Sequence, residues 1–482
     1  MSLSGVDYLV IAAYLLAITA FGSWFARFQK TTRDYFLTGR SVPWWAICFT
    51  IVATETSTLT FIGVPAQAYG RPGNMTFLQL ALGYIIGRIV VSALFIPAYF
   101  RGELFTSYEL LQRRFGSSVK TLSAGIFLFT RSLADGIRLF TAALVVGIVI
   151  QVPVTWVAIV LGVAMIVFTM RGGAAAVIWT DVVQMFIYVI GAGVVAIALL
   201  NRIDGGWSEV VRFGAETGRF VWLDARLDFS APYTIWAGVL GGIALTLSTH
   251  GTDQFLVQRL LSARTQQAAS RGLILSGFIV FAQFVLFLLI GVMLARYYQD
   301  VPLPRPLQRP DEILPLFVVS ELSNGLAGFI IAAIIAAALS PSLNAMAATT
   351  VTDFYLPYVN PDADQATQMR ISKLATVVWG IVQLAVAILA QFLNDSVLNA
   401  GLAVLGFSSG SVLGAFLLGT LAPKVRQRDT LLGMIAGLIV MSGVWWATTI
   451  GFTWYVLIGA TTTCVVAMVS RALSATAPAA EA

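Results

Sequence analysis

The sequence predicts an all-α polytopic membrane protein with about 13 transmembrane helices. Of its 482 residues, 58% are hydrophobic and only 11% are charged, whereas soluble domains carry about 25% charged residues. Apolar segments of about 20 residues, long enough to cross a bilayer, recur along the whole chain. Two of these segments carry a polar interruption five spans apart, which is typical of transporters built from inverted repeats.

The spans are separated by short loops that differ in charge. The predicted spans are 7-26, 43-69, 75-99, 119-150, 153-169, 175-200, 232-251, 271-296, 314-350, 371-393, 398-421, 429-449 and 451-471. Loops rich in Arg and Lys alternate with loops that have none. The positive-inside rule therefore predicts an extracytoplasmic N-terminus and a cytoplasmic C-terminus.

The second span is interrupted by hydroxyl residues. Residues 54–60 read Thr-Glu-Thr-Ser-Thr-Leu-Thr, in the middle of an apolar stretch. Such side chains compete for backbone hydrogen bonds and weaken a continuous helix. We expect a broken membrane helix whose freed carbonyls and hydroxyls line a binding site. The alternative is an intact helix whose polar face packs against its neighbours.

A second polar interruption lies in the seventh span, at residues 246–253, and includes His250. Because the interruptions are five spans apart, the chain divides into two five-helix halves with a site between them. The predicted regions are an extra N-terminal helix and cytoplasmic loop (1-42), the first inverted repeat (43-200), an extracytoplasmic loop with a short helix (201-231), the second inverted repeat (232-422), and two C-terminal helices with a short tail (423-482).

The fourth span carries ionisable residues near its centre. Arg131, Asp135 and Arg138 lie within about 60° of one another on a helix and form one charged face. Charges at that depth face the interior of a helix bundle or a water-filled cavity, and Glu55 would balance the group. We expect these residues to hold a polar solute, or to form a permanent salt-bridge network.

Two other ionisable residues are candidates. Asp181, near the cytoplasmic end of the sixth span, is a ligand for a small hard cation, a titrating group or a helix cap. His250 is the only histidine and is either a site residue or a packing residue.

Several function classes lack their motifs. No nucleophile–base set, phosphate-binding loop or metal-ligand spacing occurs, so we expect no enzyme and no direct use of ATP. The net charge of +6 lies mostly in short loops, so it reports membrane orientation and not nucleic-acid binding. Cys48 and Cys464 are far apart and suggest no disulfide. The expected partners are the lipid bilayer and a small-molecule solute, with the oligomeric state left open.

Sequence motifs from about residue 5 to 422 resemble, in order, those of the sodium/solute symporter family. They are Asp34-Tyr35-Phe36-Leu37-Thr38-Gly39-Arg40, Ser57-Thr58-Leu59-Thr60-Phe61-Ile62-Gly63, Trp179-Thr180-Asp181, Gln258-Arg259, Ser342-Leu343-Asn344, Asp353-Phe354-Tyr355 and Leu405-Gly406-Phe407. The resemblance implies a LeuT-type 5+5 inverted-repeat core with one extra N-terminal and two extra C-terminal helices. It also implies alternating access around a central site.

The resemblance further implies where sodium, the coupling ion, would bind. The cation-binding positions are the carbonyls of Ala53, Thr56 and Ile334, the side chains of Ala337 and Ala338, and, for a second ion, Asp181 and Ser340. Family members usually have Ser or Thr where this chain has Ala337 and Ala338. Losing two of about five oxygen ligands weakens sodium binding.

The leading hypothesis is therefore a secondary active transporter in the inner or plasma membrane that moves a small polar or charged organic solute, coupled to sodium. The expected substrate-binding residues are Glu55, Ser57, Thr60, Gln79, Arg131, Asp135, Arg138 and His250. One alternative is a sodium-independent carrier, either driven by protons through Glu55, Asp181 or His250 or uncoupled. Another is a membrane sensor that binds a solute without moving it.

Overall fold

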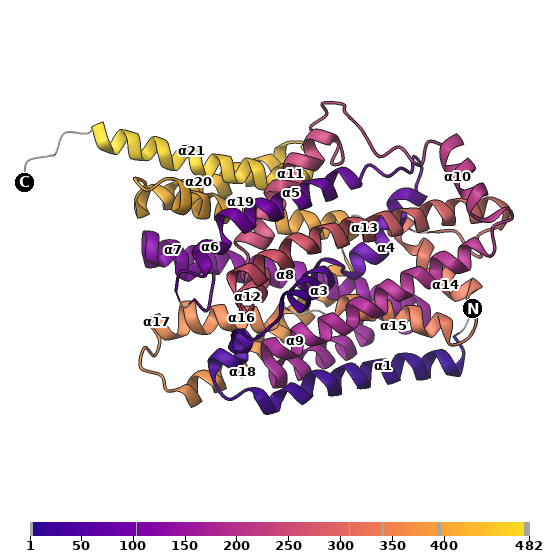
Figure 1. Cartoon of the computed structure of the whole chain (residues 1–482), viewed down its shortest axis with the longest axis horizontal. Coiled ribbons are helices and arrows are strands. Elements are labelled where there is room, and N and C mark those ends of the chain that lie inside the picture. Colours follow the sequence, from indigo (N-terminus) through magenta and orange to yellow (C-terminus); the bar gives the residue numbers. More distant parts are fainter. Residues whose placement is uncertain (1–2, 103, 308, 340–341, 393–396, 477–482) are drawn as a thin grey trace, which may run out of the picture.

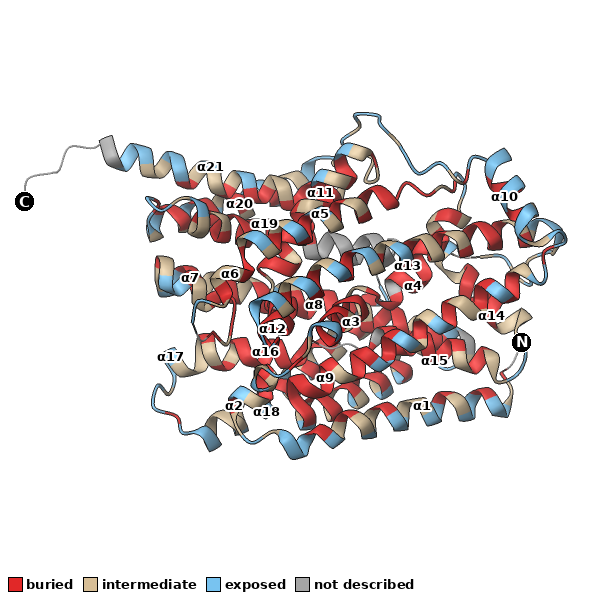
Figure 2. Ribbon diagram, in the orientation of Figure 1, coloured by how far each residue is buried: buried red, intermediate tan, exposed pale blue. Residues whose placement is uncertain are grey.

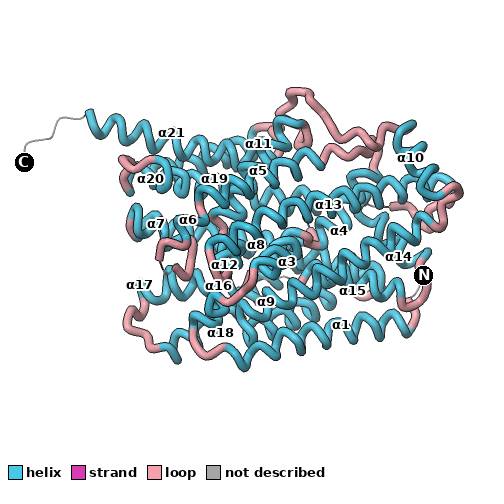
Figure 3. The backbone as a smooth tube through the Cα atoms, viewed as in Figure 1, coloured by secondary structure: helices cyan, strands magenta, loops and turns pink. Residues whose placement is uncertain are grey.

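A computed structural model describes residues 3–102, 104–307, 309–339, 342–392 and 397–476. These residues form helices joined by turns and loops (Figure 3). Within the described ranges the only β contact is an isolated bridge between Val42 and Ala263. The expected all-α architecture is confirmed.

The first helix, α1 (Gly5–Trp24), lies along one edge of the bundle (Figure 1). A capping box starts it: the Asp7 N–H donates to Ser4 Oγ (3.3 Å) and the Ser4 N–H donates to the Asp7 carboxylate (2.9 Å). The other Asp7 oxygen accepts the N–H groups of Gly325 and Gly328 (2.7 and 2.8 Å). This carboxylate therefore joins α1 to α15 (Leu326–Ala338), which is far away in sequence.

Both predicted interruptions break a helix. The first separates α3 (Trp44–Glu55) from α4 (Thr58–Tyr69), whose axes differ by 58°. The second separates α11 (Ile235–Gly251) from α12 (Gln254–Leu261). Here the break falls only at residues 252–253, and the polar residues from 246 to 250 remain helical. Thr249 bonds back to Leu245 O within the helix, Ser248 bonds to Ser409 O of another helix, and Thr246 and His250 line a cavity.

Most of the remaining helices, both long and short, form the rest of the bundle around these two broken ones. They are α5 (Leu78–Leu94), α6 (Ile96–Tyr99), α7 (Tyr108–Phe115), α8 (Ser117–Ile150), α9 (Val154–Leu200), α10 (Gly206–Glu216), α13 (Gln266–Asp300), α14 (Ile313–Glu321), α16 (Leu343–Thr349), α18 (Gln365–Ala390), α19 (Val397–Leu421), α20 (Gln427–Ala447) and α21 (Tyr455–Thr476). Buried residues concentrate on α3, α9 and the inner face of α13, while α1 and α10 show exposed faces (Figure 2).

The number of spans differs in detail from the expected 13. Six described helices are long and apolar enough to cross a membrane, or seven if α3 and α4 count as one bent span. The predicted spans 153-169 and 175-200 correspond to the two helical parts of α9, which meet at a kink where Gly173 has non-helical backbone angles (φ 56°, ψ −150°). The predicted span 314-350 is divided among α14, α15 and α16. The structure therefore does not confirm the exact count.

Glycines bring the second broken helix close to α5. A Cβ on Gly83 would lie 2.6 Å from Val239 O, and a Cβ on Gly242 would lie 2.6 Å from Leu80 O. Only hydrogen fits at these two positions, so the backbones of α5 and α11 touch directly, as small residues allow in membrane bundles. This contact places α11 beside the centre of the molecule.

The loop after α9 contains the predicted short helix, α10, which is tied to the end of α13. Glu209 Oε1 accepts a hydrogen bond from Arg296 Nε (2.7 Å), and its carboxylate also accepts bonds from Arg212. These bonds, the one from Arg296 first, lower the pKa of Glu209 below its ordinary value of 4.5. The tether is therefore fully formed at neutral pH.

We expect Arg296→Gln to release α10, because the substitution removes the donor that joins the two helices. Hydrogen exchange of the amides from 206 to 216 should then become faster, whereas Arg226→Gln, in the same loop, should leave it unchanged. Because folding depresses the Glu209 pKa, the tether persists above the ordinary carboxyl pKa and is lost as pH falls through the lowered value. Loss of protection at pH 6 in the parent protein would contradict this assignment.

Candidate functional site

A cavity of about 120 Å³ lies where α3, α4, α8 and α11 meet. Its polar wall comes from the break between α3 and α4, from α8 and from α11, and its apolar wall comes mainly from aromatic side chains. The lining residues are Thr54, Glu55, Ser57, Thr60, Phe77, Tyr84, Arg131, Ala134, Arg138, Leu245, Thr246, Thr249, His250, Phe255, Leu256 and Phe284. We call this the central cavity.

Glu55, the last residue of α3, has an arginine partner that is fully buried. Arg88 of α5 has no exposed side-chain surface and forms an ion pair with Glu55 Oε2. The other Glu55 oxygen lies 3.5 Å from His250 Nε2, and Thr249 Oγ1 lies 2.9 Å from His250 Nδ1. Glu55 is therefore balanced by Arg88 and not, as the sequence suggested, by the arginines of the fourth span.

The charged face of α8 points toward the central cavity. Arg131 pairs with Asp135 one turn later (3.5 Å) and with Asp253 in the second helix break. The Arg138 side chain forms no ion pair or hydrogen bond with any described residue, and its Nη1 is shielded from solvent. Within the described part of the chain, this guanidinium is thus without a bonded partner.

The first break frees a backbone oxygen. The Ser57 N–H donates to Glu55 O (2.9 Å), so Ala53 O loses the donor that a continuous helix would give it. Thr58 Oγ1 donates to Ile334 O of α15 (3.1 Å). The break consequently leaves a carbonyl oxygen of α3 without its helical donor and joins a hydroxyl of α4 to a carbonyl of α15; oxygens of these kinds are suited to a hard cation.

A second polar cluster surrounds Asp181 of α9. Its Oδ2 accepts hydrogen bonds from Thr50 Oγ1 (2.5 Å) and Arg259 Nη2 (3.0 Å). Asp181 is completely buried and Arg259 nearly so. The cluster holds the second half of the broken α11–α12 pair against α3 and α9.

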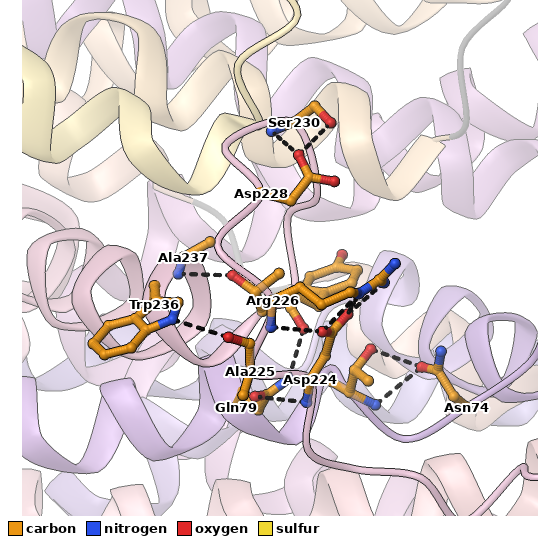
Figure 4. A network of polar contacts seen from close by, with 12 residues as sticks. Asn74, Gln79, Asp224, Ala225, Arg226, Asp228, Ser230, Trp236 and Ala237 are labelled. Carbon is orange, nitrogen blue, oxygen red and sulfur yellow. Dashed lines mark hydrogen bonds and ion pairs between the residues drawn. The ribbon is translucent and has the colours of Figure 1, made fainter.

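The structure brings six of the eight expected substrate residues to the central cavity, and a seventh, Asp135, lies directly behind it through Arg131. Gln79 is not there. Its Nε2 donates to Tyr233 O (2.6 Å) and its Oε1 accepts the Asp224 N–H (3.2 Å), so its amide holds the outer loop (Figure 4). Contact of any of these residues with a solute stays a prediction.

The expected cation positions are placed in part. Ala53 lies in the last turn of α3 and Thr56 at the first break, whereas Ile334 and the buried Ala337 lie on α15. Ser340 lies outside the described residues, as does the side chain of Ala338. Among the described residues no cluster of three His, Cys, Asp or Glu side chains could hold a metal ion.

Sequence reasoning missed Arg88 and the role of Asp253 as a partner of Arg131. A lone arginine in the middle of a predicted span is itself a signal for a buried polar contact. The aromatic residues Phe77, Tyr84 and Phe284 were also missed. No local pattern distinguishes an aromatic residue at a cavity wall from one in the core.

Two broken helices around a buried polar cavity in a helical membrane protein are typical of secondary transporters. The sequence profile of the sodium:solute symporter family matches residues 35–437, and the chain belongs to that family. It is therefore a sodium-coupled carrier and not an enzyme.

Individual relatives agree with this assignment. The sodium/sialic acid symporter NanT of Aliivibrio fischeri is 30% identical over 95% of this chain and 91% of its own length. The human sodium/iodide cotransporter is 31% identical over 90% of this chain and 68% of its own length. The structure of a substrate-bound, outward-open Na⁺-coupled sialic acid symporter matches with a TM-score of 0.91 and 28% identity, covering 98% of this chain and 99% of that one. The expected LeuT-type fold is confirmed.

We expect Glu55→Gln to destabilise the protein by about 3–5 kcal/mol, since it leaves the Arg88 charge buried without its partner. The double variant Glu55→Gln/Arg88→Gln should recover much of that loss, because it removes both charges. Thermal unfolding in detergent measures both effects. Glu216→Gln, which removes an exposed pair worth less than about 1 kcal/mol, is the control.

Additive losses in the double variant would show that the pair is not coupled. If the double variant folds, it also shows whether the Glu55–Arg88 pair holds the solute or is a permanent salt bridge. If it still transports, the Glu55–Arg88 pair is structural.

Proposed function

We propose that the protein is a sodium-coupled symporter for a small organic anion, which binds in the central cavity with its carboxylate on Arg138. The remaining arginines near the cavity already have carboxylate partners. The Arg138 side chain has none among the described residues, and that observation carries the proposal. Its Nη1 is shielded from solvent and lacks an acceptor, which is costly, and a carboxylate can accept two parallel hydrogen bonds from a guanidinium.

The balance of charge around the cavity supports co-transport with a cation. Arg88, Arg131 and Arg138 are matched in number by Glu55, Asp135 and Asp253. An anion entering alone would add one negative charge in the membrane interior, which is expensive. An anion that enters with one sodium ion leaves the balance unchanged.

The size and wall of the cavity favour a small solute. At about 120 Å³ it is slightly smaller than the ~150 Å³ cavity known to hold benzene. The aromatic rings of Phe77, Tyr84 and Phe284 line its apolar side. A monocarboxylate with a short apolar body fits this volume, whereas a larger acid requires the cavity to open.

Sodium is proposed to bind at the first break, between the Ala53 and Ile334 carbonyls. Ala337 brings only a methyl group to this region, but the Thr58 hydroxyl lies 3.1 Å from Ile334 O. We assign Thr58 Oγ1 as a ligand that compensates for the missing side-chain oxygen. The oxygen atoms at the first break are also about one helical turn from the residues proposed to bind the solute. Sodium binding and solute binding would therefore be coupled.

We expect Arg138→Gln to weaken binding of a small monocarboxylate by about 10- to 150-fold, because a hydrogen bond to a charged group contributes about 1.5–3 kcal/mol. The measurement is a thermal-shift titration with propionate or pyruvate in sodium buffer, followed by uptake into proteoliposomes. Arg138→Lys keeps the charge but loses the planar fork, so it should retain part of the affinity.

The exposed residue Arg226 provides the matched control, and Arg226→Gln should bind like the parent protein. The amide of the same acid should not bind at all. Equal binding of acid and amide, or unchanged binding in Arg138→Gln, would contradict the proposal.

For sodium, we expect Thr58→Ala to raise the half-saturating concentration by about tenfold, because one of about five or six oxygen ligands is lost. Thr58→Ser keeps the oxygen and should behave like the parent protein. Uptake is measured in proteoliposomes with a sodium gradient and, separately, with a proton gradient. Full uptake without sodium would favour the sodium-independent carrier instead.

A further inference from the structure

A second polar hollow lies far from the central cavity, at the end of the molecule opposite the N-terminus, beside α6 and α7 (Figure 1). It has a volume of about 450 Å³ and lies between the end of α5, α6, α7 and the last turns of α19. Leu94, Pro97 and Phe416 contribute apolar surface, and Arg101, Arg113 and Arg114 line it too. We call it the α7 groove.

The α7 groove is strongly basic. Its described lining contains these three arginines and no carboxylate. Arg101 is exposed, and its side chain makes no hydrogen bond or ion pair with a described residue. Arg114 Nη2 donates to Ala422 O, Pro423 O and Val425 O (3.2, 2.7 and 3.1 Å), which are neutral acceptors that leave its charge in place.

The loop before α7 is shaped to fit one of these arginines. Gly102 has a φ of 133°, a conformation that side chains other than hydrogen rarely adopt. A Cβ there would lie 2.7 Å from Arg113 Nη1. The glycine therefore lets the loop close against the guanidinium and keeps Arg101 and Arg113 on the same side of the groove.

An apolar stripe on α5 leads to the groove. Ile86 and Ile89 are 42% and 48% exposed, and Ala93 is exposed on the same helix face. Their spacing of three and four residues puts them in one line along the helix. In a membrane protein such a line contacts acyl chains, and this line ends at the α7 groove.

We propose that the α7 groove binds an acidic phospholipid from the leaflet on this face. The lipid phosphate lies against Arg101, Arg113 and Arg114, and one acyl chain follows the stripe from Ala93 to Ile86. Charge complementarity selects an anionic headgroup over a zwitterionic one, since anionic lipids are attracted to clustered arginines. This binding is independent of the solute site and does not rest on the proposed function.

The test uses the full chain purified in detergent. Native mass spectrometry counts bound phosphatidylglycerol against phosphatidylcholine, and thermal shift reports the stabilisation by each lipid. We expect a preference for phosphatidylglycerol, and about fivefold weaker binding for each arginine removed in Arg101→Gln and Arg101→Gln/Arg113→Gln. Arg101→Lys/Arg113→Lys keeps both charges and should keep the preference.

Arg370→Gln/Lys373→Gln is the matched control, since both residues are exposed on another helix, α18. The control should bind like the parent protein. Equal binding of the two lipids, or an unchanged preference in the doubly neutralised variant, overturns the proposal. Stabilisation by glycerol 3-phosphate equal to that by phosphatidylglycerol also overturns it, because the site would then bind a free phosphate and not a lipid.

Discussion

The need to match buried charges at the centre of the bundle determines how the helices around the cavity are arranged. Arg88 has no exposed surface, so the fold must supply Glu55 at the end of α3. Arg131 likewise requires Asp135 on its own helix and Asp253 from the second break. A buried charge without its partner destabilises a protein by several kcal/mol, more than a helix gains from a few apolar contacts. These pairs therefore fix α3, α5, α8 and α12 around the cavity.

Hydroxyl side chains at the first break compensate for part of the backbone hydrogen bonding that is lost there. At the first break the Thr60 hydroxyl donates to Glu55 O (3.0 Å) and Thr56 Oγ1 lies 2.9 Å from both Val52 O and Gln283 Oε1. Side-chain hydroxyls thus satisfy part of the backbone and fix the geometry of the break. The remaining carbonyls stay available for a cation. Hydroxyl residues serve both purposes, which is why their run in the sequence was informative.

The sequence predicted the local features and not the distant pairings. The first break follows from the hydroxyl run, and most of the expected site residues reach the cavity because they share helix faces with it. Arg88 was missed since its partner lies 33 positions away on another helix. Gln79 was placed at the cavity by resemblance, yet the loop at Asp224 holds its amide. The predicted span 314-350 does not appear as one helix, because it is divided among α14, α15 and α16.

The contacts on the two sides of the cavity differ in the free energy that is needed to break them. On the α12 side, separating Arg259 from Asp181 would leave two charges in the interior, at about 3–5 kcal/mol for each uncompensated partner. On the other side, Arg219 holds the end of α4 through the carbonyls of Ala68, Tyr69 and Gly70, which carry no net charge. Water at the outer loop can replace such bonds, each worth about 1 kcal/mol net. The contacts at the α4 end are therefore less costly to break than the buried ion pair on the α12 side.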